Sequence, residues 1–245
     1  SGMHGGGIAN PIHALSQIIS SMKDRNGKIT VDGFYDDVID LTVEERNQIE
    51  KVPFDEDEYP KSVGAPEAFS EEGYTVAESR WARPTLELNG IWGGYQGNGT
   101  KTVLPSEASA KVTCRLVANQ KPRQIYTLLK SHIEENLPQG VTVSVSKLPG
   151  EANPFLVPNG HNSSEVVRSV LRKLYNKEPY EIRVGGSIPV MSALLDELGV
   201  HATMFAFGLE DEQIHAPNEF FRLESFEKAQ KAYCMLLEEF ETPAT

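Results

Sequence analysis

Apolar residues recur at spacings of three and four along much of the chain, which places them on one face of a helix. These repeats predict helices that run from Asn10-Pro11 to near Asp24, from Lys121-Pro122 to before Pro138, and over 162–174, 190–198 and 223–240. A shorter helix is predicted over 42–52, because Thr42 and Glu45 have the spacing of a capping box. The glycine-rich residues 1–7 are not expected to be helical.

Other segments have the patterns of strands. Alternation predicts strands over 85–92, 108–117 and 141–145, and a further strand is expected over 180–183. Within 108–117, one face carries Ala110, Val112, Cys114 and Leu116, and the other carries Lys111, Thr113 and Arg115. The run 201–207 is apolar throughout, which is typical of a buried parallel strand.

The order of these elements predicts two domains. Residues 1–148 read as a helix, an irregular acidic insertion over 30–74, two strands, a helix and a strand, which indicates a two-layer α+β domain on an antiparallel sheet. Proline and glycine crowd into 149–160, so we predict domains 1–150 and 151–245. Helices and strands alternate after this boundary, as in the C-terminal part of an open α/β domain. The fold class is therefore α+β followed by α/β.

Composition narrows the classes of function. The 245 residues are 39% hydrophobic and 24% charged, as in globular proteins. With 23 Lys and Arg against 35 Asp and Glu, the net charge is −12, which argues against a general binder of nucleic acid or anionic membrane. No apolar run predicts a transmembrane helix, and no signal peptide is visible. Cys114 and Cys234 lie in apolar stretches, and we interpret both as buried thiols in a reducing cytoplasm.

Three segments carry candidate chemistry. His215 follows the apolar run 201–207, where open α/β sheets bind ligands; it is either a metal ligand or general base, or a surface histidine. The turn 183–189 precedes a helix, so its backbone amides either bind an anion or form a plain glycine turn. Arg115 suggests anion recognition or a buried ion pair. The acidic run 54–59 is interpreted as a loop or short helix rather than a metal site.

Six motifs occur together in a recognisable order. They are Ser1-Gly-Met-His-Gly-Gly-Gly7 with Asn10-Pro11, Pro84-Thr85-Leu86 with Asn89 to Gly94, Lys101 to Pro105, Arg115-Leu116-Val117, Gly185 to Pro189, and His215-Ala-Pro-Asn-Glu219. In this order the chain resembles the dizinc aminoacylase, carboxypeptidase and dipeptidase family. The particular branch is that of the carnosinase-like, cytosolic non-specific dipeptidases.

The resemblance implies an organisation for the whole protein. Residues 1–148 resemble the lid domain, through which these enzymes form homodimers, and 155–245 resemble the C-terminal part of the zinc-exopeptidase catalytic domain. The remaining part of the catalytic domain would hold most ligands of the two zinc ions per subunit, which manganese could replace. Ser1 does not look like a translation start, so we expect a fragment that is inactive alone and binds metal weakly or not at all. A residual tag is the alternative origin of Ser1-Gly2.

The resemblance also implies roles for single residues. Only His215 matches a zinc ligand of the family. Thr102 resembles a lid hydroxyl that meets substrate across the dimer, and Arg115 resembles the arginine that binds the substrate's C-terminal carboxylate. Gly186 and Ser187 resemble the turn at the same end of the substrate, and Arg183 belongs to that motif. Gly150 stands where a histidine of the branch is expected, so oxyanion stabilisation and ordinary dipeptidase activity are in question.

The predicted function is a metal-dependent exopeptidase that acts on dipeptides or short peptides in the cytoplasm. Two alternatives stay open. One is a non-catalytic dimerising interaction module, which Gly150 favours. The other is an N-acyl amino acid deacylase of the same family. The long insertion 30–74 favours the dipeptidase branch over family members with compact lids.

Overall fold

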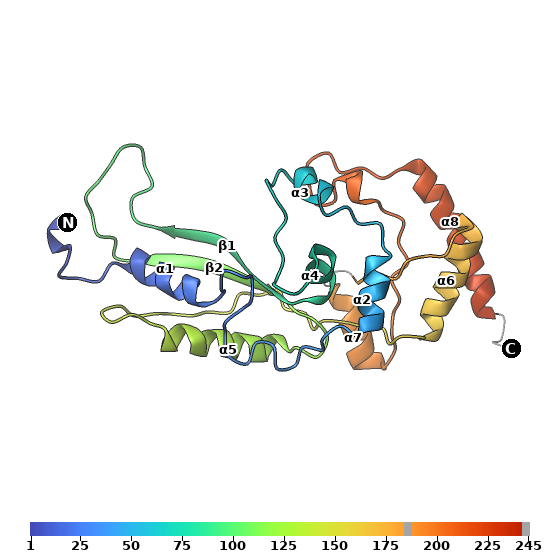
Figure 1. Cartoon of the computed structure of the whole chain (residues 1–245), viewed down its shortest axis with the longest axis horizontal. Coiled ribbons are helices and arrows are strands. Elements are labelled where there is room, and N and C mark those ends of the chain that lie inside the picture. Colours follow the sequence, from blue (N-terminus) through green and yellow to red (C-terminus); the bar gives the residue numbers. More distant parts are fainter. Residues whose placement is uncertain (184–187, 242–245) are drawn as a thin grey trace. The chain divides into compact units, whose positions relative to one another are not determined.

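The structure is a computed structural model that describes residues 1–183 and 188–241. Internal contacts divide it into two compact units (Figure 1). The first unit comprises Ser1–Phe155 with Ile182–Pro189, and the second comprises Leu156–Glu181 with Val190–Thr245. The chain thus leaves the first unit after Phe155 and returns to it for one short segment.

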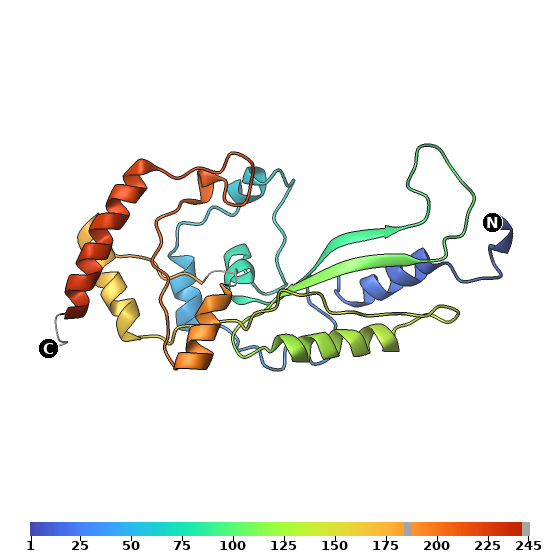
Figure 2. The same cartoon turned by 180° about the vertical axis from the view of Figure 1, so that it is seen from behind.

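The first unit is built on an antiparallel pair of strands, β1 (Thr85–Gly93) and β2 (Ala108–Arg115). Thr85 lies opposite Arg115 and Gly93 opposite Ala108, with an irregularity between Leu88 and Gly90. Two helices, α1 (Pro11–Ser21) and α5 (Pro122–Glu135), run along this ribbon (Figures 1 and 2). The predicted strand pair and its two helices are confirmed.

The core of the first unit joins these elements to the start of the insertion. Its buried members are Ile18 and Met22 of α1, Leu86 of β1, Ile125 of α5, and Ile29, Val31 and Phe34. Val112 and Cys114 of β2 pack against this core, while the alternate residues Lys111, Thr113 and Arg115 are exposed, as the alternation predicts. Because Val31 and Phe34 are buried here, together with Ile29 just before them, the insertion is anchored to the sheet from its first residues.

Local sequence signals explain where the helices begin. The Asn10 side chain accepts from the Ile12 amide at 2.9 Å and caps α1. Thr42 and Glu45 form the predicted capping box of α2 (Val43–Glu50). Sequence analysis missed α4 (Val76–Ala82), although Thr75 and Glu78 form the same box. Two shorter elements are α3 (Glu58–Ser62) and a 3₁₀ turn over Gly2–His4, where no helix was expected.

The second unit contains α6 (Asn162–Tyr175), α7 (Pro189–Leu198), a 3₁₀ turn over Glu210–Glu212, and α8 (Leu223–Glu241). Helices α6 and α8 pack together, with Val170 and Ala232 fully buried. These helices agree with the predicted ranges. Helix α6 is capped by His161, whose side chain accepts from the Ser163 amide at 3.3 Å; from the sequence, Asn162 and Ser163 were expected to cap it.

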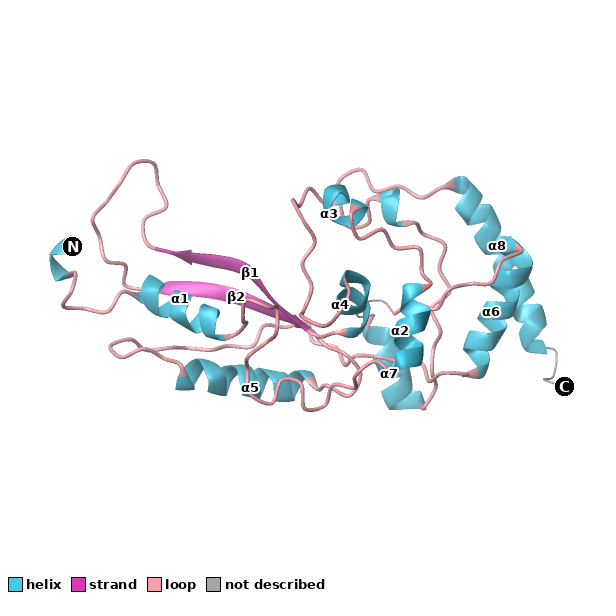
Figure 3. Cartoon of the chain, viewed as in Figure 1, coloured by secondary structure: helices cyan, strands magenta, loops and turns pink. Residues whose placement is uncertain are grey.

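Three predicted strands are wrong for this structure. Segments 141–145, 180–183 and 201–207 have no ladder partner among the described residues and run as loops (Figure 3). The side chains of 201–207 are half-buried or exposed, not buried. Side chains of the neighbouring helices hold segment 201–207 instead. The Tyr233 hydroxyl of α8 donates to the Phe205 carbonyl at 2.8 Å, and Ser163 Oγ of α6 lies 2.5 Å from Thr203 Oγ1. A strand needs a neighbouring strand, and the apolar pattern alone does not supply one.

None of the helices described is both long and apolar enough to cross a membrane.

The two thiols differ in their surroundings. Cys114 is half-buried, but Cys234 is exposed on α8, so the prediction of a buried thiol is wrong for Cys234. An apolar stretch on a surface helix leaves some positions facing solvent. Burial, with a smaller effect of Glu87, raises the pKa of Cys114 to about 12.

We therefore expect one fast and one slow thiol towards Ellman's reagent at pH 8, because only the thiolate reacts. Cys234→Ser should remove the fast phase and Cys114→Ser should leave it. Two fast thiols in the folded protein would contradict this assignment.

Candidate functional site

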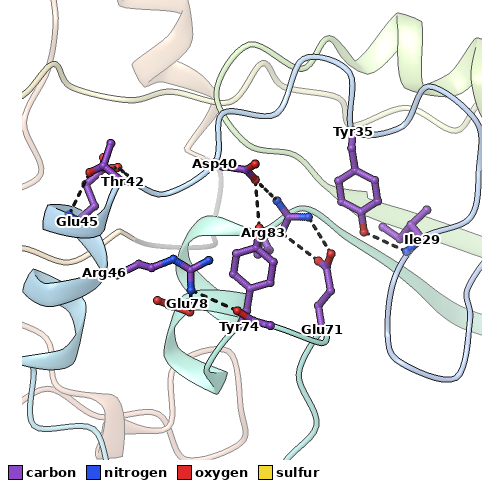
Figure 4. Close-up of polar contacts among 11 residues, drawn as sticks. Ile29, Tyr35, Asp40, Thr42, Glu45, Arg46, Glu71, Tyr74, Glu78 and Arg83 are labelled. Atoms are coloured by element: carbon purple, nitrogen blue, oxygen red, sulfur yellow. Dashed lines mark hydrogen bonds and ion pairs between the residues drawn. The ribbon is translucent and has the colours of Figure 1, made fainter.

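The most extensive polar site of the first unit surrounds Arg83, just before β1 (Figure 4). Its guanidinium makes two hydrogen bonds to Glu71, at 2.8 and 3.0 Å, and a third to Asp40 at 3.2 Å. The same group lies over the rings of Tyr74 and Tyr35, 4.3 and 4.7 Å from their centroids. Arg83 therefore holds together segments of the insertion that have little regular structure of their own.

Burial strengthens this site. The side chains of Arg83 and Glu71 are only 8% and 11% exposed. Burial alone would lower the pKa of Arg83, but the hydrogen bonds and charge of Glu71 raise it above its ordinary value. Burial raises the pKa of Tyr35 and of Tyr74, so both phenols stay neutral. An adjoining open cavity of about 540 Å³ is lined by charges of both signs, among them Asp24, Lys28, Asp40, Glu72 and Arg83.

A second arginine extends this arrangement. Arg46 of α2 donates to the buried Glu78 of α4 at 2.9 Å and lies 4.7 Å from the Tyr74 ring (Figure 4). Glu78 also accepts from the Thr75 amide at 3.0 Å. Sequence analysis missed Arg46, Glu78 and Arg83; the Thr75 to Glu78 spacing was a usable signal, but nothing local marks the arginines. Because these charges satisfy one another, we interpret the cluster as a structural clamp and not as a reaction centre.

The predicted substrate residues Thr102 and Arg115 lie at opposite ends of the strand pair. Thr102 is exposed on the loop 94–107, which leaves the Gly93–Ala108 end of the ladder. Arg115 is exposed and lies opposite Thr85 at the other end. The seven residue steps from Ala108 to Arg115 span about 23 Å at the usual rise of a strand. One subunit does not bring these two side chains to the same small ligand.

Arg183 is held by the insertion. Its guanidinium forms an ion pair with Glu45, whose carboxylate also accepts from the Thr42 amide at 2.9 Å and from the Thr42 hydroxyl at 3.1 Å. Burial alone would raise the pKa of Glu45, but these hydrogen bonds and the charge of Arg183 lower it. The neighbouring candidates Gly186 and Ser187 lie outside the described residues.

In the second unit, a closed loop presents His215. Gln213, His215 and Asn218 all have positive φ, at 56°, 63° and 65°. The buried carboxylate of Glu212 accepts from the Leu209 amide at 2.8 Å and the Arg222 amide at 3.0 Å, which closes the loop. The hydrogen bond from Leu209 contributes most to lowering the pKa of Glu212.

His215 itself is exposed on this loop. An open cavity of about 470 Å³ beside the histidine is lined by residues that include Ile214, Glu219, Phe220 and Phe221. The structure therefore gives His215 an accessible imidazole, and its neighbour Ile214 lines the cavity.

The side chains of the described residues do not form a metal site. Across 1–183 and 188–241, no group of three or more His, Cys, Asp or Glu could hold a metal ion. A zinc ion in a protein is bound by four protein ligands, or by three protein ligands and a water. The described residues therefore do not make a metal centre by themselves. Gly150, where the family resemblance implies a histidine, has φ +104° and open space around it.

Comparison with solved structures defines the class of protein. The M20 family metallo-carboxypeptidase Sso-CP2 from Sulfolobus solfataricus matches with a TM-score of 0.83 and 30% identity, over 97% of this chain and 54% of that one. The predicted fold class is confirmed by this match. Residues 1–141 match the peptidase dimerisation domain, M20_dimer, which is more than half of the chain. The chain therefore belongs to the M20 peptidases.

Curated relatives are named as dipeptidases. The chain is 28% identical over 250 residues to the Cys-Gly metallodipeptidase of Schizosaccharomyces pombe, covering 98% of this chain and 51% of that protein. It is 27% identical over 222 residues to the Beta-Ala-His dipeptidase of Rattus norvegicus, covering 89% and 45%. The chain thus spans about half the length of these relatives.

The Arg83 clamp yields a prediction about stability. Arg83→Met should lower the free energy of unfolding by about 3 kcal/mol or more, because Glu71 would remain buried without its partner. Lys61→Met is the control: its pair with Glu58 is 65% and 66% exposed, and its loss should change stability by less than about 0.5 kcal/mol. Urea unfolding measures both, and equal effects would contradict the clamp.

The ionisation of Glu45 should make the free energy of unfolding fall as the pH becomes acidic. Since its folded pKa lies below the ordinary 4.5, its stabilising effect is present above pH 4.5 and is lost as pH falls through the folded pKa. Glu45→Gln retains a side chain that can cap α2 but removes the charge. We expect this variant to be less stable than wild type at pH 7, with the difference shrinking between pH 5 and 3.

The control for this experiment is Glu44→Gln, an exposed residue in the same helical turn, which should follow the wild-type profile. Thermal unfolding across the pH range gives the measurement. A difference between Glu45→Gln and wild type that stays constant with pH would count against the assignment.

Proposed function

We propose that the protein carrying this chain is a metal-dependent exopeptidase that hydrolyses dipeptides or short peptides. The observation that carries the proposal is the similarity to named Cys-Gly and Beta-Ala-His dipeptidases over 98% and 89% of the chain. The negative net charge of −12 suits a small peptide substrate better than a nucleic acid. A cytoplasmic location, as predicted from the sequence, belongs to the same proposal.

In this proposal His215 is one metal ligand, and the others come from the half of the relatives' length that this chain does not span. Each subunit would bind two zinc ions, which manganese could replace. The accessible imidazole on a loop closed by Glu212 supports this role. Because one ligand does not hold a metal pair, this chain by itself should be inactive.

Arg115, Arg183, Gly186 and Ser187 would bind the free carboxylate at the substrate's C-terminus, which accounts for exopeptidase selectivity. Arginine suits this task because its planar donors match a carboxylate. Arg183 pairs with the carboxylate of Glu45 in the structure, and this pairing supports the proposal that it can bind a carboxylate. An entering substrate carboxylate would compete with Glu45 for the same donors.

Thr102 would serve the site of a partner subunit in a homodimer. Thr102 lies on the loop beyond Ala108, and Arg115 stands about 23 Å from Ala108 at the far end of β2. This placement supports a contact made across a dimer rather than within one subunit. Leu88, Ile91 and Trp92 of β1 are 43%, 58% and 45% exposed, and a dimer interface would cover such apolar surface.

The test uses the gene product at the full length of its relatives, with the dipeptides Cys-Gly and β-Ala-His and their C-terminal amides. We expect hydrolysis of the free dipeptides with zinc or manganese, loss of hydrolysis with a chelator or with His215→Ala, and a dimer by light scattering. Arg115→Met should raise KM for the free dipeptide far more than for its amide. The chain alone should bind no metal pair by calorimetry.

The alternatives give different results in this experiment. A dimer that hydrolyses nothing would support the interaction module, and hydrolysis of N-acetyl amino acids without dipeptides would support the deacylase. Either result would overturn the proposal, as would two tightly bound zinc ions on the isolated chain.

A further inference from the structure

The N-terminal turn lies directly against the loop that carries Thr102. Residues Gly2–His4 form the 3₁₀ turn, in which the Gly5 amide donates to the Gly2 carbonyl at 3.1 Å and the Met3 amide donates to Ser1 Oγ at 3.3 Å. A Cβ placed on Gly2 would lie 2.3 Å from the Thr102 carbonyl oxygen and 3.2 Å from Thr102 Cβ. The two backbones therefore touch at a distance that only glycine permits.

The loop 94–107 has few other supports. It contains no helix or strand, and Thr102 and its neighbours Lys101 and Val103 are exposed. Its internal contacts are local: the Tyr95 hydroxyl donates to the Asn98 carbonyl at 2.8 Å, and the Lys101 ammonium lies 4.6 Å from the Tyr95 ring centroid. At its base, a Cβ on Gly94 would lie 3.0 Å from Ile12 of α1.

Near its tip, the loop meets the N-terminal turn at Gly2. The loop has no backbone pairing of its own, so it depends on contacts such as this one and the approach of Gly5 to the Leu104 side chain.

We propose that Gly2 is a positioning residue for Thr102: its missing side chain lets the N-terminal turn seat against the Thr102 carbonyl and set the place of the hydroxyl. The consequence for substrate rests on the proposed function of Thr102. A methyl group at Gly2 would overlap the carbonyl oxygen, so one of the two segments must move by about 1 Å. A displacement of that size at a substrate contact costs on the order of 100-fold in rate.

The first test needs only the chain and trypsin, which cleaves after Lys101. Gly2→Ala should accelerate cleavage of the Lys101–Thr102 bond several-fold, because the loop loses its outer support. Gly7→Ala is the matched control just after this turn, since its Cβ would meet only the His4 carbonyl at an ordinary 3.6 Å. Gly2 and Gly7 both lie outside the buried core, so both variants should fold. Cleavage of Gly2→Ala at the wild-type rate would overturn the inference.

The second test is a double-mutant cycle on dipeptide hydrolysis by the full-length protein. Gly2→Ala and Thr102→Val should each raise KM, and the double variant should be no worse than Thr102→Val alone, because Gly2 acts through Thr102. A merely structural effect would instead add to that of Thr102→Val and would overturn the positioning role. If the wild-type protein hydrolyses no dipeptide, the proposed function fails, and trypsin cleavage alone decides whether Gly2 places the loop.

Discussion

The buried pairing of Arg83 with Glu71 is the interaction on which the first unit depends most. The insertion 30–74 contains only two short helices, so it cannot stabilise itself through backbone pairing. Its first residues are buried in the core, and its later residues are held by one guanidinium that satisfies Glu71, contacts Asp40 and stacks on two tyrosines. A buried arginine is tolerated here because hydrogen-bonding partners and aromatic faces surround its charge.

His215, Thr102 and Arg183 share one structural feature: each stands on a loop that a neighbouring group holds in place. Glu45 holds Arg183, Glu212 closes the loop of His215, and Gly2 lies against Thr102. Two of these contacts are made by a carboxylate that accepts hydrogen bonds, and the third is made by a glycine that allows two backbones to approach closely. Loops supported in this way can carry function without belonging to the sheet or helices.

The sequence named four candidate residues because its motifs occur in a recognisable order; their roles stay predictions, and the site around Arg83 was missed. His215, Thr102, Arg115 and Arg183 were all named in advance, and the structure places each of them on accessible loops or at the end of a strand. The clamps were not predictable, because Arg83 and Glu71 are twelve positions apart and Arg183 lies 138 positions from Glu45. No local pattern signals a pairing over such separations.

The sequence by itself determined most of the helices, although α4 was missed, since capping side chains and apolar repeats act within a few residues. It also determined the alternation of β2, because side chains on a strand point to opposite faces in turn. The tertiary structure decided which apolar segments became strands: 108–115 has a partner, whereas 201–207, more apolar in sequence, has none among the described residues. Strand formation depends on hydrogen bonds to another segment, and that partner is a property of the fold.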